Sequence, residues 1–225
     1  MVKREPPRYL ASAGVWLIGS VIAWGLGYDV LRSPVISDNA QLAPVAASLA
    51  ALGLVVGLAL AASASIAFHR ILKIRVPWFI PTAIGVPLGL GIGFLTNSQF
   101  LLWQVRKMGW QLVLEGGGAQ ISPPGAITLA LAGVVIGCIQ LPFLARALTP
   151  NLQTKALWIL GSFAAYGGGW SGSAILVGAA RPSPLHGALM GAISGITILL
   201  LVLVLEAEWR RPTSMKVLLS RRGRP

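Results

Sequence analysis

The chain has 225 residues, of which 55% are hydrophobic and 11% are charged, and its mean hydropathy is +0.76. These values exclude an ordinary soluble domain and predict an integral membrane protein. The formal net charge of +12 would suit a nucleic-acid binder, but the placement of the cations along the chain argues against nucleic acid as a partner. The single cysteine, Cys138, excludes a disulfide framework and a cysteine-rich metal site.

Six segments carry no charged side chain: residues 9–28, 39–69, 76–105, 116–145, 156–180 and 182–205. Each is long enough to cross about 30 Å of hydrocarbon, which takes about 20 helical residues. No segment alternates with a period of two, and a backbone in lipid must otherwise satisfy its hydrogen bonds within a helix. The predicted fold class is therefore all-α, a polytopic membrane bundle of six transmembrane helices.

In chain order, we expect helices at about 10–27, 43–68, 78–95, 125–147, 156–178 and 184–207, within a single transmembrane domain covering residues 1–225. The first helix is interpreted as a retained span, because no small-residue cleavage site closes it at Tyr28 and Asp29. The third helix carries Pro81 and Pro87, either of which can kink it. A basic C-terminal tail is expected at 209–225.

The longest connection, between the third and fourth spans, has a pattern of its own. Polar Gln104, Lys107 and Gln111 recur there at helical spacing, and apolar bulk comes from Phe100, Trp103, Trp110 and Leu114. The pattern predicts a short amphipathic helix at about 98–114, lying in the outer membrane interface. A partly buried loop helix that serves only as packing is the alternative.

A repeated unit organises these spans. Trp16, Trp78 and Trp158 each open a segment in which a hydroxyl follows four positions later and small residues recur. Gly53 precedes Trp78, and Gly133 precedes Trp158, by the same 25 positions (78 minus 53, 158 minus 133). A fixed period of this kind predicts tandem units, here three two-helix repeats. The three tryptophans each follow a basic segment and are expected to be anchors at the membrane interface.

Small residues recur at four-residue spacing in every span, which forms a groove along one helix face. In lipid, close van der Waals contact along such grooves is what makes helices associate. We therefore predict helix packing through Gly19, Gly53, Gly57, Gly85, Gly89, Gly133, Gly137, Gly161, Gly191 and Gly195. The alternative is that some of these grooves line a solute path.

The cations predict the orientation. If both termini are cytoplasmic, only Arg32, Arg106, Lys107 and Arg181 of the 18 Lys and Arg residues fall outside. This bias is the positive-inside rule, and the basic residues would contact anionic lipid headgroups. The expected location is a bacterial inner membrane or a thylakoid membrane.

Polar side chains are few within the spans, and none at mid-depth is ionisable. The inventory consists of Gln140, His186 and the hydroxyls of Ser63, Ser65, Thr82, Ser162, Ser171 and Ser173. Most of these are expected to bond another helix or their own backbone. A nucleophile, a base and oxyanion donors cannot be assembled from this set. We therefore predict no catalytic residues and no enzymatic activity.

The two histidines are the candidate cofactor ligands. His69 and His186 fall at opposite membrane faces in the predicted topology, so they cannot share one metal, and no metal site is predicted. A histidine at a helix end is more often a headgroup or capping contact. No cofactor is predicted, although a pigment or lipid bound between helices remains an alternative.

A resemblance supports this architecture. The pattern Gly133-x-x-x-Gly137-x-x-Gln140, followed by Trp158 and then by Gly187-Ala188-x-x-Gly191-x-x-x-Gly195, resembles uncharacterised bacterial Gly/Trp-rich multi-helix membrane proteins with tandem two-helix repeats. The resemblance covers the second to sixth helices and implies the repeat fold. It implies no activity.

The leading functional hypothesis is a non-enzymatic accessory or scaffold subunit that packs against other membrane subunits, with photosynthetic and electron-transfer complexes as candidates. It rests on abundant close-packing surface without intramembrane charge. The alternative is a transporter component or channel for a neutral or hydrophobic solute. Its path would be lined by Gln140, Ser162, Ser171 and Thr82.

Overall fold

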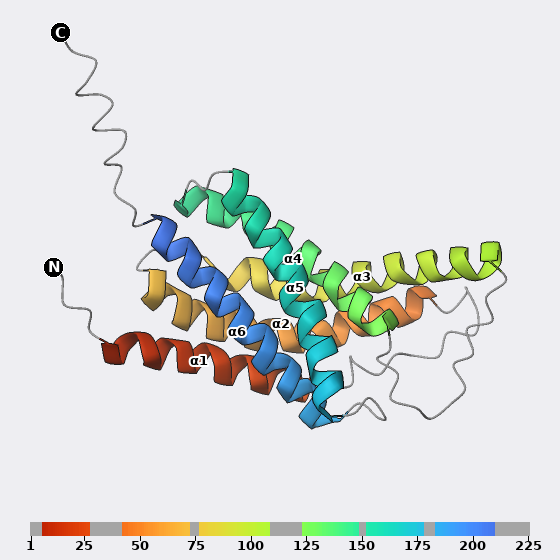
Figure 1. Ribbon diagram of the computed structural model, residues 1–225, viewed down its shortest axis with the longest axis horizontal. Helices are drawn as coiled ribbons and strands as arrows, with labels where there is room; N and C mark the ends of the chain where they lie inside the picture. The colour runs from red at the N-terminus through yellow and green to blue at the C-terminus, as the bar shows by residue number, and fades with distance from the viewer. Residues whose placement is uncertain are drawn as a thin grey trace, which may run out of the picture.

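The computed structural model describes residues 6–27, 42–72, 77–108, 123–148, 152–177 and 183–209. None of these ranges contains a strand. Each contains one helix: α1 (Pro6–Leu26), α2 (Leu42–Leu72), α3 (Phe79–Met108), α4 (Pro123–Leu148), α5 (Leu152–Val177) and α6 (Pro184–Trp209) (Figure 1). All except α5 contain a segment long and apolar enough to cross a membrane. The described part of the chain is thus all-helical, and its helices indicate a multi-pass membrane protein.

Several helices are longer than the charge-free segments from which they were predicted. α1 begins at Pro6, α2 continues to Leu72, and α5 begins at Leu152. The segments were cut at the first charged residue, but a helix can continue into the headgroup region with a charged side chain pointing toward water. The basic tail from residue 210 onward lies outside the described residues.

The predicted break after the third span is wrong. α3 runs without interruption to Met108, so residues 98–108 continue that helix and do not begin a separate interfacial one. No glycine or proline lies between Phe94 and Met108 to end it. The Asn97 amide, which could have capped a new helix, instead donates to Thr128 Oγ1 of α4 over 3.0 Å. Residues 109–114 of the predicted interfacial helix lie outside the described part of the chain.

The six helices form a closed ring. Each packs on its neighbour in sequence, and α6 returns to pack on α1 (Figure 1). Gly19 lies against Ser63 and Gly27 against Val56, so α1 and α2 are antiparallel. The hydroxyl of Tyr9 donates to Glu206 Oε1 over 2.7 Å. The start of α1 and the end of α6 therefore meet at one end of the bundle, which we call the terminal end.

Glycines lie where neighbouring helices come closest. A methyl group on Gly133 would overlap the backbone of Ser162 in α5, and one on Gly191 would overlap the backbone of Ser20 in α1. Each of the ten glycines named from the sequence has atoms of an adjacent helix within 4 Å of that methyl position. These glycine contacts include the interface between α6 and α1. The ring of helices therefore closes through glycine-mediated contact, like its other interfaces.

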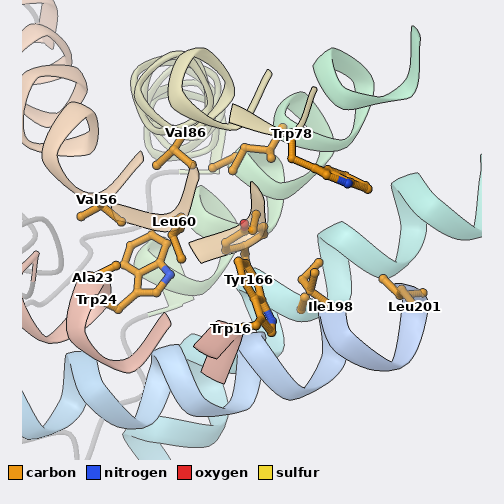
Figure 2. Close-up of a cluster of buried hydrophobic side chains, with 14 of the residues drawn as sticks. Trp16, Ala23, Trp24, Val56, Leu60, Trp78, Val86, Tyr166, Ile198 and Leu201 are labelled. Atoms are coloured by element: carbon orange, nitrogen blue, oxygen red, sulfur yellow. The ribbon is translucent and has the colours of Figure 1, made fainter. Parts of the chain in front are cut away.

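The interior is filled by aromatic and aliphatic side chains from all six helices (Figure 2). Trp16, Trp78 and Trp158 are only 4%, 1% and 2% exposed. The expectation that they anchor the protein at the membrane interface is therefore wrong. Phe68 joins them, because its ring centroid lies 4.6 Å from that of Trp16 and 5.2 Å from that of Trp78. Small residues on the same helices let the backbones approach closely. The aromatic side chains can therefore contact one another in the centre of the bundle.

Candidate functional site

The inner face of α5 carries a row of buried hydrogen-bonding side chains. Trp158, Ser162, Tyr166 and Trp170 follow one another at four-residue spacing, and all four are buried. With 3.6 residues per turn, this spacing keeps them along one side of the helix. The exposed side of α5 is apolar and includes Leu157, Leu160, Phe163, Ile175 and Leu176. The inward row fits the finding that α5 is the one described helix without a segment apolar enough to count as a membrane span.

Each aromatic residue in this row meets a ring from a different helix or helix start. The ring centroid of Trp158 lies 5.7 Å from that of Trp78, the residue that precedes α3, and the two rings are tilted against each other. Tyr166 meets Trp24 of α1 edge-on at 6.0 Å (Figure 2). Trp170 lies 4.5 Å from His186 of α6, with an interplanar angle of 34°. Such aromatic pairs contribute about 0.5–1.5 kcal/mol each beyond their area burial.

Several nitrogen atoms in this core have no hydrogen-bond partner. Trp16 donates its indole N–H to the carbonyl of Gly195 over 2.7 Å. The indole Nε1 atoms of Trp24, Trp78, Trp158 and Trp170 are buried without a partner, and so is Nε2 of His186. The other imidazole nitrogen of His186 is hydrogen-bonded to the backbone of Trp170. Buried indole N–H groups usually find an acceptor, and for these four indoles no atom of the described residues supplies it.

Three of the four residues expected to line a solute path, Gln140, Thr82 and Ser162, form hydrogen bonds within the protein. Gln140 donates to Thr82 Oγ1 over 3.1 Å, and both side chains are buried. Ser162 donates to the carbonyl of Trp158 over 2.8 Å and lies against Gly137. Ser171 is half-buried on α5. Ser63, Ser65 and Ser173 also bond their own helix, as expected from the sequence.

The two histidines lie at opposite ends of the bundle. His69 is exposed in the last turn of α2, which lies at the terminal end because α1 and α2 are antiparallel. His186 is buried in the first turn of α6, at the opposite end. Among the described residues, no group of three or more His, Cys, Asp or Glu side chains is placed to hold a metal ion. The pair therefore cannot form one shared site.

Two polar contacts were not anticipated from the sequence. One joins Tyr9 to Glu206, and the other joins Asn97 to Thr128. Asn97 had been placed in the connection after the third predicted helix, and Glu206 at the end of the sixth. A signal was present in the spacing, since Thr128 precedes Gly133 and His186 precedes Gly191 by the same five positions (133 minus 128, 191 minus 186). Both positions form a hydrogen bond with the preceding helix: Thr128 accepts from Asn97, and the His186 imidazole donates to the backbone of Trp170.

Comparison with known proteins adds no relative. No protein-family model matches the chain, and no curated protein or solved structure is significantly similar to it.

Proposed function

We propose that this protein is a non-enzymatic membrane protein that packs as an accessory or scaffold subunit in a larger assembly, with photosynthetic and electron-transfer complexes as the candidate classes. One observation supports this most directly. The interior of the helix ring contains a continuous cluster of buried aromatic and aliphatic side chains, and the polar pair Gln140 and Thr82 within it satisfies itself. Such an interior supports packing and leaves chemistry or transport little polar surface.

Under this proposal all six helices span the membrane as three hairpins. α5 fits lipid despite its lower hydropathy, because its hydrogen-bonding side chains face inward and its exposed face is apolar. The glycine contacts, such as those of Gly133 and Gly191, would then supply the close approach that holds the hairpins together. The positive-inside bias supports cytoplasmic termini in a bacterial inner membrane or thylakoid membrane, with anionic lipid at the basic ends.

The outer face of α5 is the surface best suited to a partner helix. Ala164 and Gly168 are exposed there, four residues apart. A methyl group on Gly168 would meet nothing within 4 Å. The same small-residue spacing lies at the internal helix contacts, so a helix of another subunit can approach this face in the same way.

Affinity purification from native membranes in a mild detergent tests this assignment. We expect other membrane subunits to co-purify with the wild-type protein, and Gly168→Leu to reduce their recovery several-fold, because the leucine keeps the partner backbone away. Gly14→Leu is the matched control, since Gly14 of α1 also has open space around its methyl position. Equal loss of the partner in both variants, or no partner with the wild type, would contradict the proposal.

The alternative function, a transporter component or channel for a neutral solute, receives less support. Leu60 and Ile198 are among the side chains that fill the interior cluster (Figure 2). Gln140 bonds Thr82, so neither side chain is free to contact a passing solute. Uptake of a small neutral solute by vesicles containing the purified protein would revive this alternative.

A further inference from the structure

Trp170 and His186 stand apart from the other aromatic pairs because one of their unpartnered nitrogens belongs to an indole, which can only donate, and the other to an imidazole, which can also accept. In the Trp78–Trp158 pair both unpartnered nitrogens are indole donors. Both side chains are 3% exposed, and their rings lie 4.5 Å apart between α5 and α6. Neither Trp170 Nε1 nor His186 Nε2 has a hydrogen-bond partner. We propose that these two nitrogens form a binding site for one neutral hydroxyl group, either a water molecule or the alcohol of a lipid headgroup. The site is separate from the packing role proposed above.

The hydrogen bonding of the imidazole defines what the site accepts. A neutral imidazole carries one N–H and one lone pair. The nitrogen bonded to the Trp170 backbone must be the donor, which makes it Nδ1 and leaves Nε2 with the lone pair. The site thus offers one acceptor, His186 Nε2, and one donor, Trp170 Nε1. A hydroxyl complements both, since its oxygen accepts and its hydrogen donates.

Other ligand classes fit this pair less well. A carboxylate or phosphate oxygen can accept from Trp170 but would face the lone pair of His186 without a proton between them. An ammonium group would find one acceptor and an indole N–H pointing at it. A metal ion would lack further ligands, because the described residues contain no suitable His, Cys, Asp or Glu group. A macrocyclic pigment would need an open approach to Nε2, which is fully buried.

The surrounding structure holds the pair in place near the membrane surface. The backbone N–H of His186 donates to Ser183 Oγ over 3.3 Å, which caps the first turn of α6. Pro184 and Leu185 beside it are exposed, so a hydroxyl has only a short distance to travel. Admitting an oxygen requires a small separation of the two rings, and satisfying both buried nitrogens offsets that cost.

The second hairpin, formed by α3 and α4, has a hydrogen bond between two side chains at a related position. Thr128 occupies in α4 the position that His186 occupies in α6, five residues before a packing glycine. The Thr128 hydroxyl accepts from Asn97 Nδ2 of the preceding helix over 3.0 Å. The second hairpin thus has a protein hydroxyl at the position where the third hairpin has the imidazole of His186.

The protein has only two histidines, which makes ¹⁵N-histidine NMR of the full chain in lipid bilayers a direct test. The variant His69→Gln leaves the signals of His186 alone. We expect one neutral tautomer, protonated at Nδ1, whose Nε2 resonance is shifted by an accepted hydrogen bond. In phosphatidylcholine bilayers, transfer of magnetisation from water to Nε2 identifies water. If added phosphatidylglycerol replaces that signal with one from its headgroup, the bound hydroxyl belongs to lipid.

Trp170→Phe removes the donor but keeps an aromatic ring, so the hydrogen-bond shift of Nε2 should fall severalfold. Trp158→Phe is the matched control, because it removes another buried, unpartnered indole from the same face of α5 and should leave the His186 signals unchanged. Equal effects of both substitutions would overturn the proposal. An Nε2 in the His69→Gln protein that accepts no hydrogen bond in either lipid, or that carries a proton, would also overturn it without reliance on the tryptophan variants.

Discussion

The hydroxyl of Tyr9 donates to Glu206 Oε1 over 2.7 Å, joining two residues that lie 197 positions apart. Glu206 is the only acidic side chain among the buried residues of the described helices, with 8% exposure. The bond ties the first turns of α1 to the last turns of α6, which is where the ring of helices closes. An ionised or polar group at this depth is costly unless it is bonded. The contact therefore both satisfies the carboxyl group and fixes the seam.

We predict that Tyr9→Phe lowers the free energy of unfolding by about 1.5–3 kcal/mol, the usual range for a hydrogen bond to a charged group. The substitution keeps the ring and removes only the donor. Thermal unfolding in detergent, followed by tryptophan fluorescence, measures the change. Leu10→Ala is the control, since Leu10 is an exposed neighbour and should shift the midpoint less. A Tyr9→Phe protein as stable as the wild type would show that the bond contributes little to ring closure.

Glycine-to-alanine substitutions should have opposite signs at two positions. Gly133→Ala places a methyl group into the Ser162 backbone, and overpacking of this kind typically costs about 1–3 kcal/mol. Gly168→Ala meets nothing within 4 Å and should stabilise α5 by up to about 1 kcal/mol through helix propensity. The thermal unfolding midpoints of the two variants, each compared with that of the wild type, measure the two effects. The same sign for both would argue against close approach as the reason for glycine at position 133.

The buried pair Gln140 and Thr82 should show energetic coupling. Thr82→Val removes the hydroxyl that accepts from Gln140, and Gln140→Leu removes the donor. Interhelical hydrogen bonds in membrane proteins contribute about 0.6 kcal/mol on average and up to about 1.7. A double-mutant cycle on unfolding free energies should give a coupling energy in that range. Zero coupling would mean that Gln140 and Thr82 do not satisfy each other, which would weaken the argument against a polar solute path through them.

Particular residues illustrate how far the sequence could predict this fold. Charge-free length predicted that helices would form, because lipid leaves a backbone few other ways to bond. The ends of those helices were less accessible, since a helix such as α2 continues past His69 to Leu72 without regard to where charge begins. α3 was divided wrongly because a rise in polarity near Asn97 resembled a boundary, whereas that side chain bonds α4.

The candidate sites were harder to predict than the helices. The tryptophans were placed at the interface because they follow basic segments, but the structure buries Trp78 and Trp158 against each other. Periodicity places a residue on a face of its helix and does not tell which neighbour covers that face. The same limit applies to His186. Its position near a helix end was visible in the sequence, whereas its stacking on Trp170 depends on the packing of α5 against α6.

Native mass spectrometry of the protein released gently from its own membrane decides whether this chain packs as a subunit of a larger membrane assembly. We expect a species heavier than the 23.6 kDa chain that contains at least one different membrane polypeptide. A spectrum containing only the 23.6 kDa monomer with bound lipid, under conditions that preserve other membrane complexes, would contradict it.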